Sequence, residues 1–275
     1  MRAVRKGFFL VLLIISSGLG QQPHLQFYRS KALELFNQGQ YPAAIDSMLR
    51  WAETYTAERG MAYYYVGESY YNLGLDESSI PRALSFFNEG AQYFDKASKQ
   101  TDLISLSSSK LKEALYKKGW CYYRLAEIEN DPVAALDKAV RSFSEAAASG
   151  MDTLSFYAHY MVGEAQYRLS EWKRMQMYFS QNEVQALEWA QEGIQSLTAA
   201  EHAFQQVIDS RGISQNLRAC ARLKYQDVLM AWGKLYQQMP PGIFQKITDL
   251  RKKNRLKSLP RAFCFKSITN RSSAA

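Results

Sequence analysis

Three stretches of the chain share one pattern of aromatic, small and apolar positions. They read YYYVGESYYNLG at residues 63–74, LYKKGWCYYRLA at 115–126 and HYMVGEAQYRLS at 159–170. Aligned on the central glycine, each stretch has one tyrosine three residues before it, another four residues after it and a leucine six residues after it. Tyrosines seven residues apart lie on one side of a helix, because two turns take about 7.2 residues, whereas in a strand they would lie on opposite faces. The pattern therefore predicts three helices.

Each predicted helix is followed by a second element in which an alanine precedes a phenylalanine by four residues. The pairs are Ala83 and Phe87, Ala139 and Phe143, and Ala200 and Phe204. A small and a large side chain on one helical stripe let a neighbouring helix approach while the ring fills the gap. The N-terminal stretch NQGQYPAAIDSMLRWAETY carries the related pair Ala44 and Met48. Two helices per unit, recurring along the chain, indicate a repeat architecture.

The predicted repeats are irregular in length. Their aligned glycines, Gly67, Gly119 and Gly163, are 52 and 44 residues apart. The largest excess is the stretch WKRMQMYFSQNEVQALEWAQEGIQ, residues 172–195, which is long enough to form a further helix. We expect an all-α array over residues 21–240, with units near 25–56, 60–94, 112–149, 156–210 and 214–238.

Both ends of the chain differ from this array. Residues 1–20 begin with the basic MRAVRK, continue with the apolar GFFLVLLII and end in the small residues SSGLG, which is the order typical of a secretory signal peptide. The apolar run is shorter than the roughly 20 residues that cross a bilayer, so we expect no stable membrane span after removal of the signal. Residues 241–275 are basic and lack a sustained apolar stripe, which predicts a poorly ordered tail.

The formal net charge of +8 comes mostly from these ends. Three basic residues lie in the predicted signal, and eight lie among the last 26 residues, which hold no Asp or Glu. The remaining body has 23 basic and 26 acidic residues. A slightly acidic body lacks the positive field that follows phosphates, so we expect no nucleic-acid partner.

The sequence lacks the motifs of catalysis and of cofactor or metal binding. It has no G-x-S-x-G elbow, no glycine-rich phosphate loop and no H-E-x-x-H pair. The three histidines are far apart in sequence: His24, His159 and His202. We therefore predict no enzyme activity, no cofactor and no metal. Two of Cys121, Cys220 and Cys264 could form one disulfide in an oxidising compartment, and the alternative is that Cys121 and Cys220 are buried, unpaired thiols.

The unit described above resembles the tetratricopeptide repeat (TPR) over roughly residues 25–232. The resemblance implies an α-solenoid of helical hairpins with irregular repeats and inserts. The chain departs from the family in its period, which is about 34 residues there, and lacks the proline near the end of the second helix. Together with the predicted signal, the repeats are similar to BamD-like and Tol-Pal-associated TPR proteins. This implies an exported protein that is periplasmic or associated with the bacterial cell envelope.

In helical-hairpin arrays the first helix of each unit lines the concave side. We expect the aligned glycines, with Tyr70 and Tyr122, to face the packed interior. The predicted partner-binding groove consists of Tyr64, Tyr71, Tyr116, Trp120, Tyr123, Arg124, Tyr160, Tyr167 and Arg168. Tyrosine and arginine dominate binding hot spots, although aromatic residues at helical spacing also pack cores, and the pattern leaves that alternative open.

These features favour a non-catalytic scaffold that binds a peptide or a partner protein. A second hypothesis is a structural subunit of a secretion, motility or surface apparatus, in which an oligomer buries aromatic residues of the insert. The candidates for that surface are Trp172, Met175, Met177, Tyr178, Phe179 and Trp189. A third hypothesis is a glycan-binding module, because tyrosine and tryptophan also stack on sugars. The sequence does not identify the partner.

Overall fold

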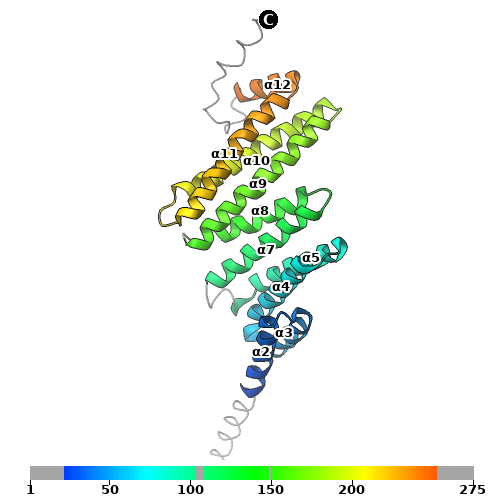
Figure 1. Cartoon of the computed structure of the whole chain (residues 1–275), viewed down its shortest axis with the longest axis vertical. Coiled ribbons are helices and arrows are strands. Elements are labelled where there is room, and N and C mark those ends of the chain that lie inside the picture. The colour runs from blue at the N-terminus through cyan, green and yellow to red at the C-terminus, as the bar shows by residue number, and fades with distance from the viewer. Residues whose placement is uncertain (1–21, 103–107, 149, 151, 253–275) are drawn as a thin grey trace, which may run out of the picture. The chain divides into compact units, whose positions relative to one another are not determined.

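The computed structural model describes residues 22–102, 108–148, 150 and 152–252. In these residues the regular structure consists of ten α-helices and one short 3-10 helix, η1 (Thr56–Glu58), which follow one another along the chain (Figure 1). The predicted all-α fold of consecutive helical hairpins is confirmed. The chain divides into two compact units, Met1–Gly150 and Met151–Ala275.

The N-terminal unit consists of three antiparallel hairpins. Its helices are α2 (Gln22–Asn37), α3 (Tyr41–Thr54), α4 (Arg59–Asp76), α5 (Ile80–Ser98), α7 (Ser108–Ile128) and α8 (Val133–Ala148). Within this unit each helix packs against the next one in sequence. Gly39 makes the first sharp turn, between α2 and α3, with a φ of 72° that side-chain-bearing residues rarely adopt.

The C-terminal unit consists of α9 (Thr153–Phe179), α10 (Glu183–Asp209), α11 (Gln215–Gln238) and α12 (Pro241–Lys252). Helices α9 and α10 have 27 residues each. The stretch 172–195 forms no separate helix, because it lengthens both helices of this hairpin instead. The hairpin therefore absorbs the largest insert without interrupting the packing of α9 on α10.

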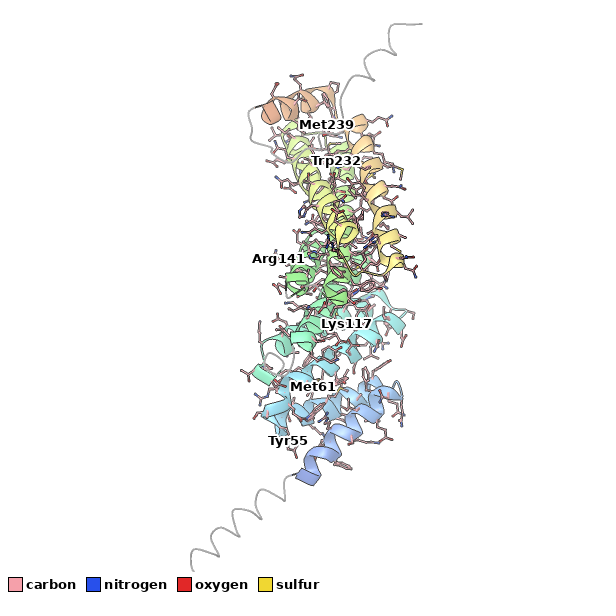
Figure 2. The ribbon with its side chains drawn as sticks, turned by 90° about the vertical axis from the view of Figure 1, so that its left-hand side faces the viewer. Tyr55, Met61, Lys117, Arg141, Trp232 and Met239 are labelled. Carbon is pink, nitrogen blue, oxygen red and sulfur yellow. The ribbon has the colours of Figure 1, made fainter. Side chains whose placement is uncertain are left out.

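The predicted tail begins later in the chain than the composition suggested, because residues 241–252 form α12. Ile243 and Ile247 of this helix are 1% and 2% exposed, and they join a core that also holds Trp232 and Met239 of the preceding segment (Figure 2). Isoleucines four residues apart lie on one side of a helix, and this short stripe packs α12 onto α10. Residues 253–275 of the predicted tail lie outside the described residues.

The recurring glycines allow close contact with buried phenylalanines. A Cβ atom added to Gly119 would lie 2.6 Å from the ring of Phe143, and one added to Gly163 would lie 2.7 Å from the ring of Phe204. Both rings are fully buried. Because any larger residue would overlap these rings, the prediction that the glycines face the packed interior is confirmed.

In the hairpin of α4 and α5, two glycines of α4 each contact a phenylalanine of α5. Gly67 faces Phe94, at 2.9 Å from a built Cβ, whereas Phe87 packs on Gly74 at 2.8 Å. The residue that corresponds to Phe143 and Phe204 is therefore Phe94. The predicted residue, Phe87, lies seven positions before it. Phe94 has its own small residue four positions earlier, Gly90. Seven residues are about two helical turns, so both pairs satisfy the same sequence pattern.

Helix α4 receives its N-terminal cap from a distant part of the chain. The preceding residue, Glu58, does not cap the helix with its side chain. Instead, the N–H groups of Gly60 and Met61 donate to the two carboxylate oxygens of Asp102 at 3.1 and 3.2 Å. Asp102 is 8% exposed, and a negative charge at a helix N-terminus is favoured by the helix dipole. This contact ties the start of α4 to the segment after α5.

Replacing Asp102 with alanine is expected to lower the free energy of unfolding by about 1–3 kcal/mol, because a buried and a part-buried N–H group lose a charged acceptor. Urea unfolding followed by circular dichroism measures the change. Glu145→Ala, at an exposed position of α8, is the control and is expected to stay within about 0.5 kcal/mol of the unchanged chain. Equal losses in the two variants would contradict the assigned cap.

Candidate binding sites

The structure places the nine predicted groove residues at different depths. Tyr64 and Tyr123 are only 3% and 4% exposed. The remaining seven are half-buried: Tyr71, Tyr116, Trp120, Arg124, Tyr160, Tyr167 and Arg168. The last three of these belong to the C-terminal unit, and the others belong to the N-terminal unit. The common sequence register therefore does not give these side chains a common exposure.

Tyr64 is a core residue, which corrects its place in the predicted groove. Its ring packs edge-on against Phe94 with the ring centroids 5.7 Å apart. Its hydroxyl donates to Glu113 of α7 at 2.7 Å and lies 3.2 Å from a carboxylate oxygen of Glu68. Burial, reinforced by these two carboxylates, raises the pKa of Tyr64 far above its usual value. The hydroxyl thus finds its partner inside the protein.

Tyr123 is corrected in the same way. Its ring lies edge-on to that of Trp120, with 5.5 Å between centroids, and almost none of the side chain reaches solvent. Trp120 in turn contacts the ring of Phe143 at a centroid distance of 6.2 Å. These rings fill the contact between α7 and α8. Tyr123 therefore offers almost no surface to a partner.

A row of basic side chains on α7 covers the tyrosines of α4. Lys110 Nζ lies 4.7 Å from the ring centroid of Tyr64, and Lys117 Nζ lies 5.4 Å from that of Tyr71 (Figure 2 labels Lys117). Arg124, the third member of the row, hydrogen-bonds Tyr71, which partly offsets the rise that burial causes in the pKa of Tyr71. The seven-residue spacing of these three basic residues is present in the sequence, and the predicted groove contains only Arg124 of the three.

Acidic neighbours balance this basic row. The ion pairs are Lys110 with Glu113 at 2.6 Å, Lys117 with Glu68 at 3.2 Å, and Arg124 with Glu127 at 2.7 Å. Each cation is thus matched by a carboxylate on its own helix or on α4. The row stabilises the contact between the two helices rather than presenting excess positive charge to an acidic partner.

The N-terminal unit contains an open cleft of about 470 Å³ between α3, α4 and α5. Its lining residues are Pro42, Ile45, Asp46, Tyr70, Leu73, Asp76, Glu77, Arg82 and Phe86. Apolar side chains form most of this lining, and the charged ones are mainly acidic. A concave, largely apolar surface with a few polar groups is the usual form of a binding site. The cleft is therefore the best candidate for a binding site in the described residues.

Two aromatic residues, Tyr70 and Phe86, form one wall of the cleft. Tyr70 of α4 stacks on Tyr93 of α5, with a centroid distance of 5.7 Å and an interplanar angle of 16°, and lies 6.3 Å from Phe86. Burial, then Tyr93 and the carboxylates of Glu89 and Asp46, raise the pKa of Tyr70. Tyr70 is half-buried, which corrects the expectation that it belongs to the packed interior. Phe86 and Tyr93 are seven residues apart, so the sequence itself places them on one side of α5.

The carboxylates of the cleft differ in their contacts and in their exposure. Glu77 pairs with Arg82 at 3.0 Å and accepts a hydrogen bond from the N–H of Ser79 at 2.9 Å. Asp46 and Asp76 are exposed residues of the lining. Two carboxylates beside stacked aromatic rings favour a ligand with both apolar surface and hydrogen-bond donors.

The insert of the C-terminal unit is partly buried. Met177 is 1% exposed, and Trp172 and Trp189 are half-buried. The other three predicted surface residues are exposed: Met175 at 40%, Tyr178 at 58% and Phe179 at 67%. These three lie at the end of α9, where the chain turns into α10.

The described residues contain no group of three or more His, Cys, Asp and Glu side chains that could hold a metal ion. Burial lowers the pKa of His159, and the nearby His202 lowers it further, so tertiary structure brings two distant histidines together. Cys121 is a buried free thiol whose pKa is raised by burial, and Cys220 is an exposed free thiol. Cys264 lies outside the described residues. No helix in the described part of the chain has the length and apolar character to cross a membrane.

Comparison with known proteins gives no family. No protein-family model and no curated protein sequence matches this chain. A structure from the computational design of self-assembling cyclic protein homo-oligomers aligns with a TM-score of 0.37 and 9% identity, over 84% of this chain and 92% of that one. A de novo designed helical repeat protein aligns with a TM-score of 0.36 and 14% identity, over 78% of this chain and 96% of that one. The helices themselves define the class, an all-α helical repeat-like protein.

Proposed function

We propose that this chain is a non-catalytic protein-interaction scaffold that binds an extended peptide segment of a partner in the cleft between α3, α4 and α5. The observation that carries the proposal is the cleft itself, with Tyr70 and Phe86 in its wall and Tyr93 stacked on Tyr70. Tyrosine supplies a large contact area at a low cost in side-chain entropy. Asp46 and Asp76 in the lining supply acceptors for the N–H groups of a peptide.

The finer assignment is a TPR-like scaffold of the bacterial cell envelope. It rests on the recurring glycine and aromatic positions, and on the order of basic, apolar and small residues in the first 20 positions. The helical hairpins agree with this assignment without distinguishing TPRs from other helical repeats. The predicted partner is a protein or peptide, because the apolar and acidic lining of the cleft suits aromatic contacts and hydrogen bonds to N–H groups.

Site-specific photo-crosslinking tests the proposed cleft in the full chain. A benzoylphenylalanine residue at Pro42, an exposed position in the lining of the cleft, is expected to form a discrete adduct with a partner in the cell. The same residue at Glu145, an exposed position on α8, is the control site and is expected to form no such adduct. Mass spectrometry of the adduct identifies the partner and the crosslinked peptide.

A second substitution shows whether the aromatic wall binds the partner. Tyr70→Ala removes the ring that stacks on Tyr93 and is expected to reduce the adduct at position 42 by at least about tenfold, which corresponds to 1.4 kcal/mol. Tyr157→Ala, at a tyrosine that is 41% exposed in the C-terminal unit, is expected to leave it unchanged. Equal adducts from both crosslinking sites, or an adduct unaffected by Tyr70→Ala, would refute the assignment of the cleft.

A further inference from the structure

Aromatic rings of the N-terminal unit are repeatedly found together with a basic group and a carboxylate. In four places among the described residues, one basic group lies 4.7–5.8 Å from a ring centroid and 2.6–3.4 Å from a carboxylate oxygen. The face of a ring and a carboxylate both attract a cation, so the three groups hold together electrostatically. We call each such set a cation triad, and the four are Trp51, Arg29 and Glu58; Tyr64, Lys110 and Glu113; Tyr71, Lys117 and Glu68; and Trp120, Arg124 and Glu127.

The cleft between α3, α4 and α5 contains two members of a cation triad without the third. Tyr70 and Phe86 supply the rings, and Asp46 and Asp76 supply the carboxylates. Among the residues that the structure describes, no basic group lies over either ring, and none pairs with either carboxylate. The open cleft thus has the surroundings that this unit provides for a cation elsewhere.

The basic residue in the lining of the cleft, Arg82, does not supply the missing cation. Arg82 pairs with Glu77 at 3.0 Å, so these two charges match each other. The carboxylates of Asp46 and Asp76 remain in the lining without a counter-ion among the described residues. The pKa of Tyr70 is raised by burial first and then by groups that include Asp46, so the negative charge of Asp46 reaches this ring. The cleft therefore combines aromatic surface with negative charge that is not neutralised.

Asp76 is unfavourable for the helix that carries it. It is the last residue of α4, and the C-terminal end of a helix carries a partial negative charge that disfavours a carboxylate. The last turn of α4 holds no basic residue that would offset the two negative charges. The helix itself therefore gives no reason for a carboxylate at this position, whereas a cation bound in the cleft does.

We propose that the cleft binds an arginine or lysine side chain of the partner, which supplies the missing member of a cation triad. This inference rests on the proposed function and specifies the chemistry of the partner, an extended segment in which a basic residue is flanked by apolar ones. The basic group lies between the carboxylates and the rings of the cleft. The flanking apolar side chains cover Pro42 and Leu73 in the same lining.

Removal of charge in the photo-crosslinking assay tests the inference. Asp46→Asn combined with Asp76→Asn keeps the shape of both side chains and removes their charge. The adduct of benzoylphenylalanine at position 42 of the full chain is then expected to fall at least about tenfold. Glu53→Gln combined with Glu145→Gln makes the same change in net charge at exposed positions outside the lining and is expected to leave the adduct unchanged.

Thermal unfolding shows that a lost adduct does not come from a lost fold. The variant with both asparagines is expected to unfold at the temperature of the unchanged chain or slightly above it. The reason is that Asp76→Asn removes a charge that the dipole of α4 disfavours.

The crosslinked segment itself reports the chemistry of the partner. Mass spectrometry is expected to find an arginine or a lysine within a few residues of the crosslinked position. A synthetic peptide of that segment, with citrulline in place of the arginine or acetyllysine in place of the lysine, loses the charge. It is expected to bind the full chain at least about tenfold more weakly than the charged peptide in isothermal titration calorimetry. The variant with both asparagines is expected to bind the two peptides with nearly equal affinity, because the carboxylates that distinguish them are gone.

The outcomes separate this inference from the proposed function. An adduct that is lost with Tyr70→Ala but persists in the variant with both asparagines would leave the proposed function in place and overturn the inference. A crosslinked segment without a basic residue, or one that comes from this chain itself, would overturn it as well. The absence of any adduct at position 42 would refute the proposed function and this inference together.

Discussion

Replacing Tyr64 with alanine is expected to lower the free energy of unfolding of the N-terminal unit by about 3–5 kcal/mol. The change removes a ring that is 3% exposed and packed on Phe94, and it removes the hydrogen bond to Glu113. A cavity remains where the ring was, because the surrounding helices relax only in part. Urea unfolding of the full chain, followed by circular dichroism, measures the loss.

Two further variants assign this effect to burial. Tyr64→Phe keeps the ring and loses only the hydroxyl, so it is expected to cost about 1 kcal/mol. Phe27→Ala removes an aromatic ring that is 63% exposed in the same unit and is expected to change stability by no more than about 0.5 kcal/mol. If Tyr64→Ala proved as mild as Phe27→Ala, Tyr64 would line an open surface as the sequence pattern predicted.

The same substitution at two glycines of the C-terminal unit is expected to have opposite effects on stability. Gly163→Ala should lower the free energy of unfolding by about 1–3 kcal/mol through overpacking, since its Cβ would lie 2.7 Å from the buried ring of Phe204. That ring cannot move freely, because Tyr160 packs edge-on against it at a centroid distance of 5.5 Å. Gly233→Ala should raise the free energy of unfolding by about 0.5–1 kcal/mol, because alanine favours the helix and no atom lies within 4 Å of the added carbon.

Thermal and urea unfolding of the two glycine variants measure the expected loss and the expected gain of stability within the C-terminal unit. The comparison holds the chemical change constant and varies only the neighbouring atoms. A stabilising Gly163→Ala would mean that α9 and α10 do not approach as closely as the structure shows. A destabilising Gly233→Ala would indicate that another part of the chain covers α11 at that position.

The periodic pattern was sufficient to place the helices and their contacts of closest approach. Glycine inside a helix costs about 1 kcal/mol relative to alanine, so its recurrence at one register indicated close packing. Gly119 and Gly163 meet phenylalanines that carry the recurring alanine four residues before them. In α5 two phenylalanines, Phe87 and Phe94, each follow a small residue by four positions. Only the packing of α5 on α4 places Phe94, and not Phe87, against Gly67.

Burial of the tyrosines could not be predicted in the same way. Tyr64 and Tyr71 occupy one side of α4 and are equivalent in the sequence pattern, yet Tyr64 is buried and Tyr71 is half-buried. Two other helices bury Tyr64, because its ring packs on Phe94 of α5 and its hydroxyl donates to Glu113 of α7. The cleft has the same origin, because α3, α4 and α5 each contribute residues to its lining. The short stripe of α12 was missed because a 12-residue basic segment has too few apolar positions to show a sustained period.

The sequence by itself determined that this protein is all-α, that its helices form consecutive hairpins and that glycines recur where two helices meet. These properties follow from side-chain periodicity and from the shape of single residues, which act over a few turns of one helix. Only the tertiary structure decided which tyrosines are buried, where a cleft opens and which apolar side chains stay exposed. The reason is physical: the exposure of a side chain depends on the helix that covers it, and that helix comes from another part of the chain.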